Sequence, residues 1–266
     1  MKLRFLSACA AAACVFGVGV GPVAARVPAQ DNKQAEQPQV SGDERKAAEK
    51  IVKAKGPEAK LQTSAEFVKK YPQSALRPQV VEGLANDIAN TQDVQLRISL
   101  AESFAAIFTG PGEAERVTPL LIDSYVTAGR TADAFRLAQT YFASHPEETN
   151  VFYRLAILAS NESIKGNNAF AAVGRQYGAR AIELIEADKM GPGADPAKWP
   201  AFKAEALPLL YRATGIIAFK TDDRAAARQL LGKAVEHKVA DPGVYLVLAD
   251  LANAEYVPGP LGGEDD

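Results

Sequence analysis

The chain has 266 residues and a formal net charge of -2, from 30 basic and 32 acidic side chains. This near balance argues against a general nucleic-acid-binding protein, because such proteins carry a clear basic excess. Alanine accounts for 49 residues, and its high helix propensity favours closely packed helices over a β-sandwich.

Residues 1–25 have the pattern of an export signal. Two basic side chains lie among the first four residues, Phe5–Val20 carries no charge, and small residues precede a cleavage site after Ala25 or Ala29. An apolar run of about 16 residues is shorter than the roughly 20 that a membrane-spanning helix needs. We therefore expect a periplasmic or secreted protein after cleavage near Ala25. A retained signal, or lipidation at Cys9, would instead hold the chain at a membrane.

The mature chain is expected to lack cysteine, because Cys9 and Cys14 both lie in the signal. Residues 26–42 are rich in Gln, Pro, Asp and Asn and predict a disordered linker, since they cannot bury enough apolar surface to offset their ordering entropy. A helical pattern covers residues 43–256, without the period-two alternation of strands. Residues 257–266 hold two prolines, three glycines and three acids, which predicts a disordered acidic tail.

Prolines recur at breaks in the helical pattern, at Pro72, Pro111 and Pro146. Their spacings, roughly 35 to 40 residues, indicate a repeat architecture. The clearest unit covers residues 115–148, where two helical stretches are separated by Gly129-Arg130. This unit resembles a tetratricopeptide repeat, which is a pair of antiparallel helices about 34 residues long.

Four residues occupy the leucine, tyrosine, small and closing proline positions of that family: Leu121, Tyr125, Ala134 and Pro146. Three residues depart from it at the opening tryptophan, glycine and aromatic positions: Thr118, Ile122 and Ala138. The register returns one full repeat later, from Thr118 to Phe152 and from Tyr211 to Tyr245. The resemblance therefore implies an all-α fold, a right-handed α-solenoid of antiparallel helix pairs.

Each helix pair must stack on the next, because a lone pair cannot bury its apolar face. Small residues allow close helix approach, and aromatic residues fill the space between pairs. We expect the following residues to form this packing: Leu121, Tyr125, Ala134, Phe152, Tyr211, Gly215, Ala227 and Tyr245.

The interval from Phe152 to Tyr211 exceeds one repeat of this family by about 25 residues. We predict that the surplus forms loops at Ser163–Val173 and Met190–Pro200. Loops inserted between repeats are often functional. Trp199, the only tryptophan, is therefore either an anchor for a partner or a cap on the solenoid core, and we favour the cap.

We predict no enzyme, no cofactor and no metal site. His145 and His237 fall at helix ends in different repeats, where a histidine meets the negative end of the helix. The sequence has no glycine-rich phosphate loop or paired-histidine motif. The alternative is a cell-wall glycan-acting enzyme, since Glu162-Ser163 resembles the Glu-Ser pair of lytic transglycosylases, in which the glutamate is a general acid. The residues that follow, 164–167, do not match that family.

The resemblance to tetratricopeptide proteins implies a concave face lined by the first helix of each pair. Register places these residues on that face: Arg116, Asp123, Asn150, Tyr153, Ile157, Asn161, Arg212, Phe219, Lys220, Asp250 and Asn253. Their mixture of amides, aromatics and both charge signs suits an extended peptide or protein segment. We therefore expect an exported, non-enzymatic scaffold or adaptor that mediates protein–protein interactions in the bacterial cell envelope. A membrane-anchored assembly factor with an uncleaved signal is a further alternative.

Overall fold

The computed structural model describes residues 40–254, and within them every regular element is a helix. The elements are α1 (Gly42–Lys53), α2 (Pro57–Lys70), α3 (Arg77–Ala89), α4 (Val94–Ile107), the short 3₁₀ helix η1 (Ala114–Arg116), α5 (Thr118–Thr127), α6 (Thr131–Phe142), α7 (Thr149–Ile164), α8 (Ala171–Glu186), α9 (Trp199–Lys220), α10 (Arg224–Glu236) and α11 (Pro242–Asn253). The predicted all-α class is confirmed. The predicted signal, most of the predicted linker and the predicted tail lie outside the described residues.

The first described helix starts with a capping box. The Ser41 hydroxyl accepts a hydrogen bond from the Glu44 N–H, and the Glu44 carboxylate accepts one from the Ser41 N–H at 2.8 Å. This exchange satisfies two backbone donors that a helix start leaves unpaired. Helix α1 therefore begins at Gly42, one residue before the predicted boundary.

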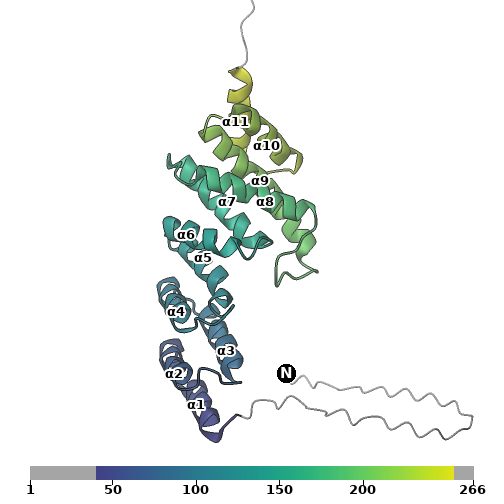
Figure 1. The fold of residues 1–266 in the computed structure, drawn as a ribbon. Coiled ribbons are helices and arrows are strands. Elements are labelled where there is room, and N and C mark those ends of the chain that lie inside the picture. The colour runs from purple at the N-terminus through teal and green to yellow at the C-terminus, as the bar shows by residue number, and fades with distance from the viewer. Residues whose placement is uncertain (1–39, 255–266) are drawn as a thin grey trace, which may run out of the picture. The chain divides into compact units, whose positions relative to one another are not determined.

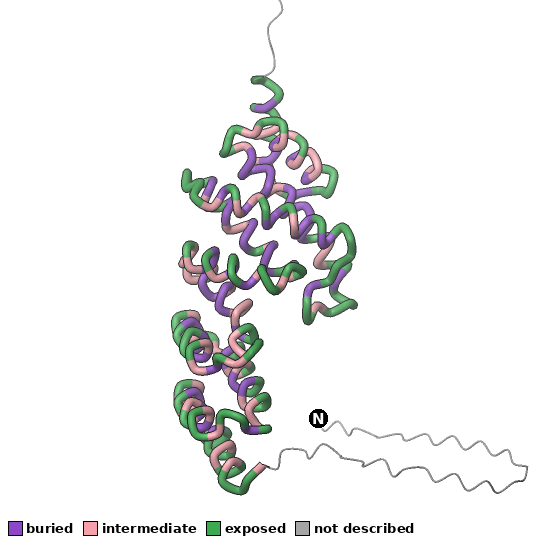
Figure 2. The backbone as a smooth tube through the Cα atoms, viewed as in Figure 1, coloured by how far each residue is buried: buried purple, intermediate pink, exposed green. Residues whose placement is uncertain are grey.

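The helices pack as successive pairs, α1 with α2, α3 with α4, α5 with α6, α7 with α8, and α9 with α10 (Figure 1). First helices also touch the next first helix, as α5 touches α7 and α7 touches α9. The buried residues follow the interior of these pairs, and exposed residues follow the outer turns (Figure 2). The arrangement is an α-solenoid in which each pair covers the apolar face of its neighbour.

The break between α5 and α6 comes from a Schellman motif. The Gly129 N–H donates to the Val126 carbonyl at 3.1 Å, and the Arg130 N–H donates to the Tyr125 carbonyl at 2.8 Å. Gly129 has a φ of 71°, which glycine adopts without steric strain. The motif satisfies two C-terminal carbonyls and turns the chain back, so α6 packs against α5.

The same motif ends α8, α9 and α10, but there a residue with a side chain holds the left-handed position. Asp188, Asp222 and Lys238 have φ angles of 53°, 60° and 61°. At the end of α10, the Lys238 N–H donates to the Val235 carbonyl at 2.8 Å. A left-handed conformation is strained for residues other than glycine.

Replacing Lys238 with glycine should therefore raise the free energy of unfolding by about 1 kcal/mol, because the strain disappears. Gly129→Ala is the matched opposite change and should lower it by about 1 kcal/mol. Urea unfolding followed by circular dichroism measures both. A destabilised Lys238→Gly protein would contradict this account of the turn.

Helices α7, α8 and α9 approach one another closely, and glycines of α8 face small side chains there. A Cβ added to Gly174 of α8 would lie 2.1 Å from the Cβ of Ala159 on α7. A Cβ added to Gly178 would lie 2.3 Å from the Thr214 hydroxyl oxygen on α9. A side chain at Gly174 would displace the α7 backbone, because the Ala159 Cβ cannot move by itself, and one at Gly178 would displace the Thr214 side chain. These glycines therefore allow the close spacing of the three helices.

Gly174→Ala should lower the free energy of unfolding by about 2–3 kcal/mol through overpacking. Gly232→Ala on α10 is its control, because a Cβ there meets nothing within 4 Å, and it should stabilise the protein by up to about 1 kcal/mol. Chemical unfolding compares the two variants. Equal changes in the free energy of unfolding for the two variants would show that close helix approach does not exclude a side chain at Gly174.

Seven of the eight residues expected to pack between repeats are buried: Leu121, Tyr125, Ala134, Phe152, Tyr211, Gly215 and Ala227. The eighth expectation is wrong, because Tyr245 is 53% exposed. Tyr245 lies on α11, and among the described residues no second helix follows α11 to cover it.

The predicted loop insertions are only partly present. Helix α7 extends to Ile164 and α8 begins at Ala171, so helix ends occupy much of the predicted loop Ser163–Val173. The surplus over one repeat is instead taken up largely by helix length, with 16 residues in each of α7 and α8 and 22 in α9. The second predicted loop is real, since residues 187–198 connect α8 to α9 without a helix.

Candidate functional site

Three of the residues predicted to line a partner-binding face form ion pairs that join first helices, and a fourth, Asp250 of α11, pairs with Arg224 of α10 at 4.0 Å. Arg116 pairs with Glu82 of α3 at 2.7 Å, Asp123 of α5 pairs with Arg154 of α7, and Arg212 of α9 pairs with Asp241 at the start of α11. Each of these three pairs connects one first helix, or its entry turn, to another. These charges therefore bridge neighbouring repeats.

The other predicted residues of that face differ in exposure. Tyr153 is half-buried and its ring meets Phe202 of α9 edge-on, with the centroids 5.9 Å apart. Ile157 and Phe219 are also half-buried. Five are exposed: Asn150, Asn161, Lys220, Asp250 and Asn253. Contact of this face with a partner stays a prediction.

Three buried tyrosines each donate a hydrogen bond to a glutamate on, or directly before, a neighbouring helix. The Tyr125 hydroxyl reaches Glu102 of α4 at 2.7 Å, and the Arg130 guanidinium lies over the Tyr125 ring, 4.4 Å from its centroid. Burial first, and then the hydrogen bond to the Glu102 carboxylate, raise the pKa of Tyr125 to about 12. Tyr141 with Glu148, and Tyr211 with Glu186, repeat the pairing.

This shift predicts a stability loss in alkali. Because the folded-state pKa of Tyr125 exceeds the unfolded value of about 10, its contribution is complete below pH 10 and is lost as pH rises towards 12. Tyr125→Phe should lower the free energy of unfolding by about 1 kcal/mol at pH 8. The gap between parent and variant should shrink above pH 10, as unfolding curves across that range measure. A gap that stays constant to pH 12 would contradict this reading.

The Glu162 side chain does not have the environment of a general acid. It accepts hydrogen bonds from the Lys165 ammonium and the Asn167 amide, both at 2.9 Å. The Lys165 contact, followed by the Asn167 contact, lowers the pKa of Glu162. A glycosidase acid needs a raised pKa so that it holds a proton at neutral pH. This geometry argues against the transglycosylase alternative.

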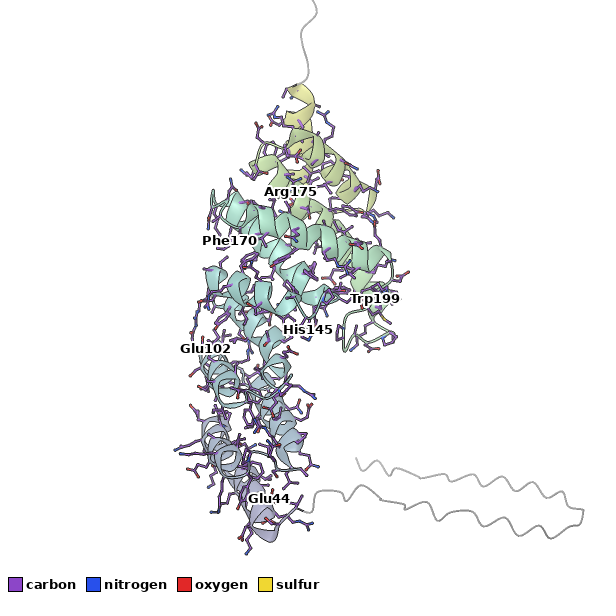
Figure 3. All side chains as sticks on the ribbon, viewed as in Figure 1. Glu44, Glu102, His145, Phe170, Arg175 and Trp199 are labelled. Carbon is purple, nitrogen blue, oxygen red and sulfur yellow. The ribbon has the colours of Figure 1, made fainter. Side chains whose placement is uncertain are left out.

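The two histidines lie where helix ends were expected to hold them. His145 follows α6 (Figure 3). Its Nδ1 lies 3.2 Å from the Tyr141 carbonyl, and its ring stacks on Tyr141 with the centroids 4.1 Å apart. His237 is the C-terminal cap of α10 and stacks on Tyr211. Within residues 40–254, no three His, Cys, Asp or Glu side chains cluster closely enough to hold a metal ion. In the same range, no helix has both the length and the apolar character needed to cross a bilayer.

An aromatic groove runs between α6 and α8, the second helices of two successive pairs. It consists of two adjoining hollows of about 530 and 460 Å³. The second helices contribute most of its lining: Phe135, Gln139 and Phe142 from α6, and Phe170, Gln176 and Tyr177 from α8 and the residue before it. Phe142, Gln176 and Tyr177 line both hollows, so the two form one continuous surface.

The rings of the aromatic groove contact one another across the helices. Phe135 stacks on Phe170 with centroids 4.6 Å apart, and Phe142 meets the edge of Tyr177 at 4.9 Å. Phe152 of α7 lies beneath, stacked on Phe142 at 3.7 Å. These contacts hold the rings in fixed orientations, which gives the groove a rigid apolar floor.

The groove was not predicted, because the sequence placed the binding face on first helices and this groove lies between two second helices. The signal was present: Phe135 and Phe142 are seven residues apart on α6, and Phe170 and Tyr177 are seven apart on the next second helix. That spacing puts both members of each pair on one helix face. Neither spacing, however, predicts that the aromatic face of α6 lies beside the aromatic face of α8.

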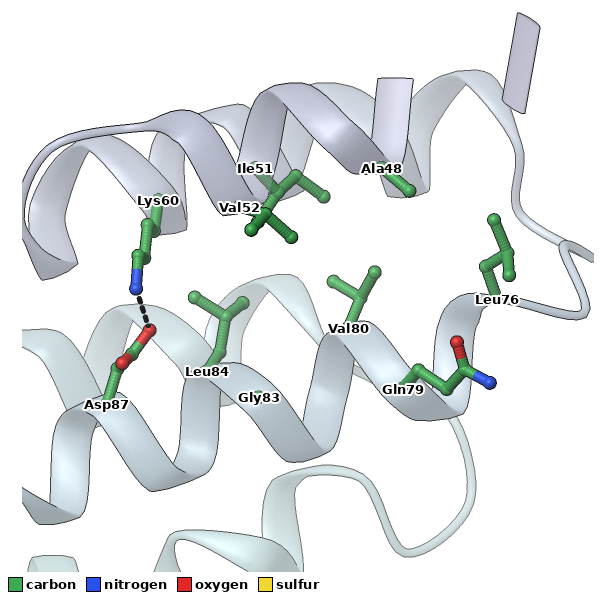
Figure 4. Close-up of a pocket in the computed structure, with 10 residues that line it drawn as sticks. All are labelled: Ala48, Ile51, Val52, Lys60, Leu76, Gln79, Val80, Gly83, Leu84 and Asp87. Atoms are coloured by element: carbon green, nitrogen blue, oxygen red, sulfur yellow. Dashed lines mark hydrogen bonds and ion pairs between the residues drawn. The ribbon is translucent and has the colours of Figure 1, made fainter. Parts of the chain in front are cut away.

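A separate hollow of about 300 Å³, away from the aromatic groove, lies between α1 and α3 (Figure 4). Aliphatic side chains such as Ile51, Val80 and Leu84 line it. The ion pair between Lys60 and Asp87, at 2.7 Å, closes one end. Its walls carry no aromatic ring and few polar groups, so it offers less to recognise than the aromatic groove.

Trp199 is the first residue of α9 and directly follows the long connection from α8. Its side chain is 9% exposed, stacks on Phe202 at 5.4 Å, and its ring N–H lies 3.4 Å from an Asp188 carboxylate oxygen. Lys203 also contacts Asp188, at 2.7 Å, and this contact lowers the pKa of the Asp188 carboxyl. A buried, anchored ring agrees with the cap that the sequence favoured.

No protein-family model matches the chain, and no curated protein matches it. Among solved structures, it is similar to the crystal structure of a tetratricopeptide repeat protein from Parabacteroides merdae ATCC 43184. The two share 14% identity with a TM-score of 0.32, over 80% of this chain and 100% of the other. The fold assignment rests on the helix pairs themselves, since a likeness at this level adds no support.

Proposed function

We propose that this protein is an exported, non-enzymatic, tetratricopeptide-like scaffold that binds a segment of a partner protein in the bacterial cell envelope. The aromatic groove is its binding site. The observation that carries the proposal is the continuous floor of rings shared by two hollows between α6 and α8.

The chemistry of the groove specifies the kind of segment. Rigid aromatic walls favour apolar or aromatic side chains, which bury large area with little loss of conformational entropy. Gln139 and Gln176 are exposed at the groove, and each amide offers both a donor and an acceptor to a peptide backbone. Arg136, paired with Asp133 at 2.5 Å, and Arg180, paired with Glu183 at 2.8 Å, bring no uncompensated charge. A neutral, apolar segment fits these walls better than a charged one.

Export is the second part of the proposal and rests on residues 1–25. The basic start, the uncharged run and the small residues before Ala25 support cleavage by a signal peptidase. The mass of the protein recovered from the envelope fraction tests this part by itself. A mature protein starting at Arg26 or Gln30 is expected, and a mass that retains residues 1–25 would contradict it.

The binding test places a photo-cross-linking amino acid at Gln139 of the full chain in living cells. We expect an adduct with one partner protein, and Gln176→Arg should abolish that adduct, because a long charged side chain would lie over both hollows. A synthetic peptide of the cross-linked segment should then bind the purified parent chain at least tenfold more tightly than the Gln176→Arg variant.

The control variants carry the same change elsewhere. Gln95→Arg on α4 and Gln229→Arg on α10 replace exposed helical glutamines, and Arg has a similar helix propensity to Gln. Both should leave the adduct intact. An adduct unaffected by Gln176→Arg but lost with Tyr153→Ala would move the site to the first-helix face, and no adduct at Gln139 would reject the groove.

A further inference from the structure

Tyr177 differs from the other buried tyrosines of residues 40–254, because its hydroxyl has no hydrogen-bond partner among the described residues. Its side chain is only 6% exposed. The other three, Tyr125, Tyr141 and Tyr211, each donate to a glutamate at 2.5–2.7 Å. Burial alone raises the pKa of the Tyr177 hydroxyl, whereas burial and a glutamate both raise that of the other three. The Tyr177 hydroxyl is therefore a free donor.

This hydroxyl opens into the aromatic groove. Tyr177 lines both hollows. Within residues 40–254, the only unpaired side-chain polar atoms that are sealed from solvent are the hydroxyl oxygens of Ser160 and Ser163, so the Tyr177 oxygen is accessible at the groove surface. An occupant that covers it must accept a hydrogen bond, because a buried hydroxyl without a partner costs free energy.

The walls around Tyr177 offer few acceptors to an occupant. Backbone groups in the middle of α6 and α8 are bonded within their own helices, so the groove has no strand edge that could pair with a peptide backbone. Phenylalanine rings form most of its floor, and the amides of Gln139 and Gln176 are exposed at it. An ordinary extended peptide would therefore lay most of its N–H groups on rings, where they stay unpaired.

A proline-rich segment meets both requirements of the site. Proline has no backbone N–H, so such a segment places no unpaired donor on the rings. In the polyproline II conformation no carbonyl is bonded within the segment, which leaves an acceptor for the Tyr177 hydroxyl. Aromatic-lined grooves recognise this preformed conformation in unrelated folds.

The spacing of the rings also agrees with this conformation. The groove runs along α6 and α8, since one hollow touches their earlier turns and the other their later turns. Phe135 and Phe142 are seven residues apart, as are Phe170 and Tyr177. Seven helical residues rise about 10 Å, and one polyproline II turn of three residues rises about 9 Å. Prolines three residues apart would therefore reach successive hollows.

A helical occupant fits less well, although its spacing is also suitable. An apolar helix with anchors seven residues apart has the same rise of about 10 Å. Its inner carbonyls, however, are bonded within the helix and leave no acceptor for the Tyr177 hydroxyl. Covering Tyr177 with such a helix would leave the hydroxyl buried and unpaired.

We propose that the aromatic groove binds a proline-rich segment in the polyproline II conformation, and that the Tyr177 hydroxyl donates a hydrogen bond to one of its carbonyl groups. This inference rests on the proposed function and names the class of segment. An uncharged segment also suits the charge of the walls, because Arg136 and Arg180 are paired with acids of their own helices.

Fluorescence anisotropy of a labelled oligoproline of about ten residues, titrated with the purified full chain, tests the class of segment. We expect saturable binding that Gln176→Arg weakens at least tenfold and Gln95→Arg leaves unchanged. An alanine-rich helical peptide with two leucines seven residues apart should bind at least tenfold more weakly than oligoproline. No saturation up to about 1 mM, tighter binding of the helical peptide, or binding that tolerates Gln176→Arg would each overturn the proposal.

Two tyrosine-to-phenylalanine changes test the hydroxyl. Tyr177→Phe removes an unpaired hydroxyl, so it should weaken oligoproline binding about three- to tenfold without lowering the urea concentration at which the protein unfolds. Tyr125→Phe removes a hydroxyl bonded to Glu102, so it should bind oligoproline like the parent but unfold at a lower urea concentration. Equal affinity of Tyr177→Phe and the parent would contradict the hydrogen bond.

The cross-linking experiment separates this inference from the proposed function. An adduct at Gln139 whose cross-linked segment contains no proline would reject the proline-rich class and keep the groove as a binding site. Absence of any adduct would reject the groove itself. A cross-linked segment with prolines three residues apart is the expected result.

Discussion

Close approach of α7, α8 and α9 through small residues is the constraint on which the rest of the fold depends. Gly174 and Gly178 of α8 face Ala159 and Thr214, with no room for a Cβ between them. At this spacing the long helices bury aliphatic side chains on two sides, and Leu155, Ile185 and Leu210 are fully buried. Since interiors are packed as densely as organic crystals, the spacing cannot relax to accept a larger residue.

Ion pairs also connect the helices of the N-terminal part, α1 to α4. Arg77 of α3 makes a bidentate contact with Glu113 at 2.5 and 2.7 Å, and this contact lowers the pKa of Glu113. Lys60 and Asp87 connect α2 to α3. The Arg77–Glu113 pair is largely buried, whereas Lys60 and Asp87 are more exposed, so their ion pair contributes less to stability. The N-terminal part and the rest of the described helices both have a buried apolar core, and helix packing is most extensive among α7, α8, α9 and α10.

The repeat unit from residue 115 to 148 was predictable because its signals are local. A glycine break and residues spaced on one helix face determine two short helices and their turn, and α5 and α6 lie there. Not every proline marks a break in this chain, since Pro208 lies inside α9. Packing of α9 against α7, α8 and α10 maintains the helix on both sides of that proline.

The non-local features could not be read from the sequence. The exposure of Tyr245 depends on which helix follows α11, and the aromatic groove depends on where α6 lies relative to α8. A repeat register identifies equivalent positions but does not show which of them have a neighbour.

Native-state hydrogen exchange measured residue by residue is the most direct test of this account. If the small-residue contacts among α7, α8 and α9 determine the stability of the fold, their amides should exchange most slowly, with opening free energies close to that of global unfolding. Amides of α1 and α2 should exchange earlier, through partial unfolding of the N-terminal pairs. Equal protection across all helices, or slowest exchange in α1–α4, would contradict the central claim.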